Sequence, residues 1–201
     1  PRRAAKPRRS KPPPPPPPAP EYVVAFGAGG AVGILSGVGP TLAPFGRVFG
    51  EATVTPPSTG ASSFASRVRP SARLSFDAAT AAGDVAVGSQ RYVLFAGGLR
   101  VCPVDLPFDA LHIGPCAGLE AGVHRGTSEG VPNARARDKP WITPSGTVHA
   151  SLALTKRITV ELEAGAAFPL VRTRFFLAPD LTLWRTPAVA VTANAAVTTW
   201  F

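Results

Sequence analysis

The amino-acid sequence predicts an all-β fold, an eight-stranded antiparallel up-and-down barrel. The composition argues against a helical protein, because the 201 residues include 20 Gly, 24 Pro and no Met. Apolar residues recur at every second position in short runs, which is the period of a strand and not of a helix. The segment 188–201 keeps this alternation up to a final aromatic residue, so its strand needs a partner on both sides. A closed barrel provides both partners, because it has no edge strand.

Eight segments carry the alternation and are the predicted strands: 21–35, 44–54, 72–81, 91–103, 111–124, 143–154, 158–168 and 188–201. The first contains the glycine-rich run 27–33, which imitates a dinucleotide-binding fingerprint but lacks its G-x-G-x-x-G spacing. Small residues in a first strand more simply allow tight curvature and close packing. In the second and third segments the charged residues share one parity, Arg47 with Glu51 and Arg73 with Asp77.

Two hairpins set the register of the next four segments. A turn centred near Asp109 places Cys102 directly opposite Cys116. Opposed residues of antiparallel strands lie about 4.5–5.5 Å apart at Cα, within reach of a disulfide. A tight turn at 155–157 places His149 opposite Glu163. In the last segment valines and alanines alternate with Thr192, Asn194 and Thr198, which puts the polar residues on one face.

On these parities one set of charged side chains faces the barrel interior. It comprises Arg47, Glu51, Arg73, Asp77, Arg100, Glu120, His149, Glu161 and Glu163. Carboxylates beside a histidine can serve acid–base catalysis. However, an eight-stranded barrel is only wide enough for its own side chains, and buried charges must pair. We therefore expect a lumen filled by an ion-pair network, with no catalysis, cofactor or metal. The three histidines lack ligand spacing.

The domain organisation is a tail at residues 1–20 followed by a barrel at 21–201. The tail, PRRAAKPRRSKPPPPPPPAP, carries +6 of the net charge of +9 and is predicted to be a disordered or polyproline II linker. The basic isoelectric point therefore describes the tail, and the barrel itself is no more than weakly basic. The sequence shown has no signal peptide, so we expect that one was removed or that the chain is a fragment.

The pattern favours a transmembrane barrel. Strands of about ten alternating residues can cross a bilayer without any long apolar stretch, and none of 18 residues occurs. Such barrels have short periplasmic turns and long outer loops. The turns at 104–110 and 155–157 are therefore placed in the periplasm with both termini, and the loops at 125–142 and 169–187 outside. The segment 55–71 would be an unusually long periplasmic turn.

Aromatic residues are expected at the two membrane edges, where one end of a ring is apolar and the other wet. Tyr22, Trp200 and Phe201 would mark the periplasmic edge, and Trp141 and Phe168 the outer one. The outer loop 169–187 combines arginines with aromatics and is a candidate contact surface for a partner or lipopolysaccharide, formed by Arg172, Arg174, Phe175, Phe176 and Trp184.

Two resemblances add to these observations. The ending at Trp200 and Phe201 resembles the C-terminal signature of bacterial outer-membrane barrels, which implies recognition by the barrel-assembly machinery. Position 199, which often holds an aromatic in such signatures, is Thr. The segments LRVCPVDLPFDALHIGPCAGLEAGVHRG and FPLVRTRFFLAPDLTLWRTPAVAV resemble uncharacterised small barrels of Gram-negative, myxobacterial-type bacteria. This likeness implies a fold and a location only.

The sequence thus predicts an outer-membrane barrel with a structural, anchoring or envelope-assembly role. Expected partners are membrane lipid and lipopolysaccharide, and peptidoglycan or an envelope complex through the tail. A nucleic-acid partner is not expected. Two alternatives remain at this stage. One is a soluble coat protein whose basic arm binds nucleic acid, and the other is a small lipocalin-like barrel with the apolar residues inside.

Overall fold

The computed structural model describes residues 22–55, 69–85, 88–130, 136–177 and 181–201. The predicted tail and most of the segment 55–71 lie outside these residues. In the described part no helix is long and apolar enough to cross a bilayer. The barrel is formed by eight long strands: β1 (Val23–Leu35), β2 (Ala43–Thr55), β3 (Ser71–Val85), β4 (Gly88–Cys102), β6 (Leu111–Glu129), β7 (Arg137–Ala153), β8 (Ile158–Ala167) and β11 (Ala190–Trp200).

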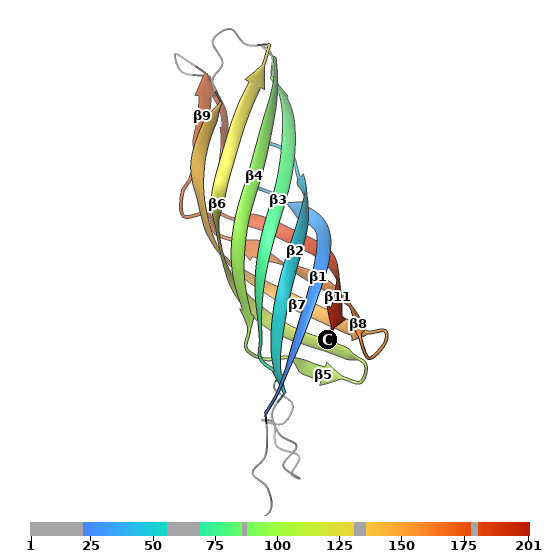
Figure 1. Cartoon of the computed structure of the whole chain (residues 1–201). Helices are drawn as coiled ribbons and strands as arrows, with labels where there is room; N and C mark the ends of the chain where they lie inside the picture. Colours follow the sequence, from blue (N-terminus) through green and yellow to red (C-terminus); the bar gives the residue numbers. More distant parts are fainter. Residues whose placement is uncertain (1–21, 56–68, 86–87, 131–135, 178–180) are drawn as a thin grey trace, which may run out of the picture.

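The eight strands close in chain order, each antiparallel to the next (Figure 1). Closure is made by β1, which pairs with β2 on one side and with β11 on the other. The β1–β11 register runs from Gly27 opposite Trp200 to Leu35 opposite Thr192. No edge strand is left in the barrel, and the predicted all-β, eight-stranded up-and-down topology is confirmed.

Three short strands that the sequence pattern did not predict accompany the barrel. β5 (Leu106–Phe108) pairs with the beginning of β6. β9 (Arg174–Leu177) and β10 (Leu181–Arg185) pair with each other as a separate hairpin within the connection from β8 to β11. We call the end of the barrel near this hairpin the hairpin end, and the end where β1 begins and β11 finishes the terminal end. In Figure 1 these are the upper and lower ends of the barrel.

At the hairpin end the strands are longer than predicted. β6 continues to Glu129 and β7 begins at Arg137, with Gly126 opposite Arg137. Most of the loop predicted at 125–142 is therefore paired strand, and the same correction applies to the ends of β3 and β4 around 82–90. The reason is that residues such as 125–129 (RGTSE) are polar on both faces. Backbone pairing persists there without the alternation that marks a strand.

Side chains alternate strictly between the interior and the outer surface. The outward positions form an apolar belt whose side chains are exposed, including Phe26, Val32, Val48, Leu74, Phe76, Phe95, Leu99, Leu119, Val123, Val148, Leu162 and Val197. The inward positions are buried and carry the charges. This arrangement inverts that of a soluble barrel, in which apolar side chains fill the interior.

The glycine-rich strand β1 makes room for two phenylalanines of β2. A Cβ added at Gly29 would lie 2.6 Å from the Phe49 ring and 2.3 Å from the Val197 carbonyl oxygen. A Cβ at Gly33 would lie 2.8 Å from the Phe45 ring. Both glycines face the lumen, so their missing side chains are the space that the rings occupy. The run has a packing role, as the sequence analysis expected.

Candidate functional site

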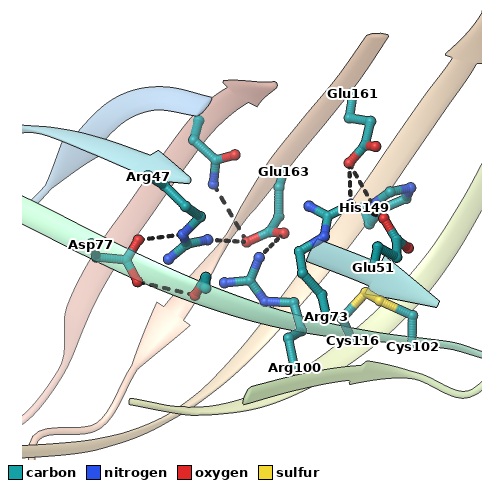
Figure 2. Close-up of polar contacts among 12 residues, drawn as sticks. Arg47, Glu51, Arg73, Asp77, Arg100, Cys102, Cys116, His149, Glu161 and Glu163 are labelled. Carbon is teal, nitrogen blue, oxygen red and sulfur yellow. Dashed lines mark hydrogen bonds and ion pairs between the residues drawn. A yellow bond between two sulfur atoms is a disulfide. The ribbon is translucent and has the colours of Figure 1, made fainter. Parts of the chain in front are cut away.

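The lumen is crossed by two groups of ion pairs (Figure 2). The group nearer the terminal end is centred on Arg73 of β3. Its Nη2 lies 2.6 Å from Glu51 Oε2 and 2.5 Å from Glu161 Oε2. The second carboxylate also accepts a hydrogen bond from the Thr198 hydroxyl, and His149 Nδ1 lies 3.8 Å from its Oε2. Strands β2, β3, β7, β8 and β11 meet in this one cluster.

The second group is centred on Arg47 and Arg100. The Arg47 side chain donates to Asp77 and to Glu120, the latter at 3.0 Å, and lies 3.9 Å from Glu163. Arg100 donates to Glu163 from the opposite side. The Asn194 amide lies 3.4 Å from the same carboxylate. Glu163 is thus held between two guanidinium groups.

Packing fixes the guanidinium planes as well as the charges. The Arg73 guanidinium lies 3.9 Å from the centre of the Phe49 ring, and that of Arg47 lies 5.4 Å from the Phe45 ring. These are cation–π distances, and a desolvated pair of this kind contributes about 2 kcal/mol. The rings themselves sit over the glycines of β1. A chain of contacts therefore runs from the small residues of β1 through aromatic rings to the arginines.

The structure brings all nine predicted lumen residues into these groups. Three arginines face five carboxylates, and every carboxylate contacts at least one arginine. The register places His149 opposite Glu163, but the contact of His149 is with Glu161. Because the carboxylates are already engaged, the geometry favours a packed, ion-paired interior over an open reactive site. No cluster suited to a metal ion occurs among the residues that the structure describes.

The predicted disulfide is present and joins Cys102, the last residue of β4, to Cys116 of β6. Their Cα atoms are 4.1 Å apart. Cys102 lines a cavity of about 210 Å³ at the terminal end, together with Glu51, His149, His112 and Trp200. His112 lies 3.1 Å from Asp105, and this pair had no signal in the sequence pattern. The cavity ends at the Arg73 group.

The two terminal aromatics differ in placement. Trp200 has the inward parity and donates from Nε1 to the Thr159 hydroxyl at 3.0 Å. Phe201 is 85 % exposed, and its amide donates to the Phe26 carbonyl of β1 at 3.0 Å. Both therefore stand at the terminal end, beside the β1–β11 closure.

An aromatic plug closes the lumen at the hairpin end, and it corrects part of the predicted contact surface. Phe175 and Trp184 of the β9–β10 hairpin are each only 8 % exposed and pack against Tyr92 and His124. Their ring centroids lie 5.1–6.4 Å from those partners. Trp141, predicted at the outer edge, is also buried in the plug, 5.8 Å from His124. The hairpin thus places these two aromatic side chains against inward-facing residues of the barrel wall.

The alternation along the strands contained the information needed to predict the plug. Tyr92 and His124 share the inward parity of the charged residues on β4 and β6, and Trp141 shares that of β7. They lie closer to the hairpin end than the ion pairs do. His124 Nε2 also makes a 2.7 Å hydrogen bond with the Val38 carbonyl of the β1–β2 connection. The plug thus ties that connection to the barrel wall.

The remaining residues of the predicted contact surface stay exposed and belong to a basic rim. Arg172, Arg174 and Phe176 are exposed, and Arg174 donates to the Thr182 hydroxyl at 2.8 Å. The basic rim consists of the exposed hairpin-end residues Arg91, Arg125, Arg137, Lys139, Arg172, Arg174 and Arg185. Two exposed acidic residues, Glu129 and Asp138, accompany them in the described part. The rim is therefore strongly positive.

Comparisons with known proteins agree with the fold. No protein-family model matches the chain, and no curated protein matches it. A major outer membrane protein from Thermus thermophilus has a similar structure, with a TM-score of 0.62 at 12% identity, covering 89% of this chain and all of that one. Neisserial surface protein A aligns over 90% of this chain and 99% of its own, with 11% identity and a TM-score of 0.48. At 12% identity, the likeness to the Thermus protein shows a shared barrel fold.

Proposed function

We propose that this chain is an outer-membrane barrel of a Gram-negative bacterium with a structural or anchoring role in the envelope. The observation that carries the proposal is the inverted distribution of its side chains. Charged residues are buried in the lumen, while side chains such as Val32, Leu74 and Leu162 are more than 60 % exposed on the outside. Lipid is the solvent that favours such a surface, because the apolar belt would be costly to hydrate.

The backbone supports the same proposal. In lipid every backbone polar group must be satisfied within the protein, and closed barrels achieve this with strands alone. The barrel strands run from 10 residues in β8 to 19 in β6, and about 9–11 tilted residues suffice to cross a bilayer. The longer strands extend beyond the belt at the hairpin end, where both of their faces are polar.

Both soluble alternatives fit the structure poorly. A coat protein of the jelly-roll type needs two sheets packed face to face, whereas this chain closes one sheet on itself. A lipocalin-like barrel needs an apolar interior, whereas this lumen holds three arginines and five carboxylates in ion pairs. In the described part of the chain, ion pairs and the plug occupy the lumen, which supports a role in anchoring more than one in transport.

We further propose that the hairpin end faces outward and the terminal end faces the periplasm. In this orientation the basic rim meets lipopolysaccharide phosphates, and the C-terminal strand meets the barrel-assembly machinery. Residues 1–20 would then reach peptidoglycan or an envelope complex. Support comes from the long connection between β8 and β11, since outer loops are the longer ones. As part of the same proposal, this chain is related to the small barrels of myxobacterial-type bacteria that it resembles in sequence.

Fractionation tests the proposal. The full chain is expressed in a Gram-negative host behind a cleavable secretory signal peptide, and the envelope is separated by density. We expect the protein in the outer-membrane fraction, soluble only in detergent, with a changed electrophoretic mobility after boiling. Protease added to intact cells should cut only at the hairpin end. A chain that is soluble without detergent would refute the proposal, and cleavage of residues 1–20 in intact cells would refute the orientation.

A further inference from the structure

The apolar belt is interrupted by a groove across β8, β11, β1, β2 and β3. Its volume is about 640 Å³. The floor is formed by small outward residues, Gly30, Gly46 and Ala195, and the walls by Val32, Val48, Phe76, Val160 and Val197. The lining is apolar apart from Arg47, whose side chain points into the lumen. The groove is therefore open only to whatever surrounds the belt.

Missing side chains create this groove. A Cβ added at Gly46 would meet no atom within 4 Å, and one at Gly30 would meet only the Arg47 carbonyl oxygen, at 3.6 Å. These glycines differ from the inward Gly29, which has no room for a side chain. The packing of the barrel thus does not require glycine at position 46, and a larger residue there would fill the groove without distorting the strand.

A positive charge lies beyond the hairpin end of the same strands. Arg185 lines a second hollow, of about 420 Å³, with Ser36, Thr41 and other residues of the β1–β2 connection. Val32 in the groove wall and Gly37 in this hollow are five residues apart, with the end of β1 at Leu35 between them, so their Cα atoms lie at most about 18 Å apart. Half of a bilayer's hydrocarbon core is roughly 15 Å thick. One lipid molecule can therefore reach from the groove to the hollow that Arg185 lines.

We propose that the groove holds one acyl chain of a lipopolysaccharide molecule whose phosphate pairs with Arg185. This inference rests on the proposed membrane location and outward hairpin end, which put the groove in the outer leaflet. An acyl chain would cover the walls that Val32, Val48 and Phe76 leave exposed. A guanidinium suits a phosphate because it can donate two parallel hydrogen bonds, and such charge-assisted bonds are about twice as strong as neutral ones.

The test compares variants that change one half of the site. Gly46→Leu fills the groove, and its matched control is Gly146→Leu on β7, another position where a Cβ meets nothing within 4 Å. Arg185→Gln removes the charge, and Arg157→Gln in the β7–β8 turn is its control. Each refolded full-length barrel is incubated with purified lipopolysaccharide and exchanged into lipid-free detergent. Native mass spectrometry then measures the fraction that keeps a bound molecule.

We expect Gly46→Leu and Arg185→Gln each to lower the retention of lipopolysaccharide about tenfold. The first variant removes the apolar contacts of the acyl chain, and the second removes the charge-assisted contact with the phosphate. Both controls should retain lipopolysaccharide like the wild type. The inference would be overturned if all variants retained the same fraction of lipopolysaccharide as the wild type. It would also be overturned if the wild type retained phosphatidylglycerol as well as it retains lipopolysaccharide. A wild-type dimer that Gly46→Leu dissociates would also overturn it, because a second copy would then be the occupant. The fractionation result is independent of all these outcomes, so the two proposals can fail separately.

Discussion

Replacing Arg73 by methionine should be the most damaging single change in the lumen. The side chain is 5 % exposed and serves two carboxylates, Glu51 at 2.6 Å and Glu161 at 2.5 Å. Methionine keeps much of the volume but removes the cation, which leaves both carboxylates buried and uncompensated. Breaking a buried pair by removing one partner costs about 3–5 kcal/mol, and the lost contact with the Phe49 ring acts in the same direction.

Urea-induced unfolding in lipid vesicles, followed by the loss of the heat-dependent gel shift, measures this change. We expect Arg73→Met to lower the free energy of unfolding by about 3–5 kcal/mol. Adding Glu51→Gln and Glu161→Gln to the same chain should recover most of the loss, since neutral amides need no counter-charge. Arg157→Met, in an exposed turn, is the control. A lone Arg73→Met that unfolds within about 0.5 kcal/mol of the wild type would refute the reasoning, because that is the range of neutral surface changes.

Three further outcomes are expected. Replacing Cys102 and Cys116 by serine should cost about 3 kcal/mol of unfolding free energy, because the bridge closes a short loop; equal urea midpoints for oxidised and reduced wild type would contradict this. Gly29→Val should yield no heat-shifting barrel after refolding, since its Cβ would lie 2.3 Å from a β11 carbonyl oxygen; a normal gel shift would show that the strand can move. The double variant Phe175→Ala and Trp184→Ala should lower the free energy of unfolding by about 3 kcal/mol or more. It should not raise the conductance of planar bilayers, because the ion pairs still cross the lumen. An open channel would show that the plug alone seals the lumen.

The sequence predicted this structure best in the strands where apolar and polar residues alternate regularly. Along residues 147–152 of β7 and 158–165 of β8 the apolar and polar residues alternate without interruption, so one tight turn determined the register of His149 and Glu163. The same argument placed Cys102 opposite Cys116. In both hairpins the register follows from the position of the turn and the period of two, and the structure has both pairs directly opposed or bonded.

Prediction was poorer where the burial or pairing of a residue depends on a segment that is distant in the sequence. Phe175 and Trp184 are aromatic residues between arginines, a composition typical of a surface loop. Their burial follows from Tyr92 and His124, which lie more than 50 positions earlier in the chain and leave space above the ion pairs. Likewise, the strand at 137–140 has charges on both faces, and only its pairing with β6 shows that it is part of the sheet. Local patterns carry no information about such long-range partners.

The uneven distribution of charge around the wall has a consequence for how the cylinder closes. Every barrel strand except β1 contributes a side chain to the ion-paired groups or to their hydrogen bonds, while β1 contributes glycines and alanines. The seam between β1 and β11 is thus fastened mainly by backbone hydrogen bonds. β1 can join or leave β11 without separating any pair of opposite charges. Because β1 lacks charged partners on β2 as well, either of its two seams can open sideways while the ion-paired groups of the described strands stay whole.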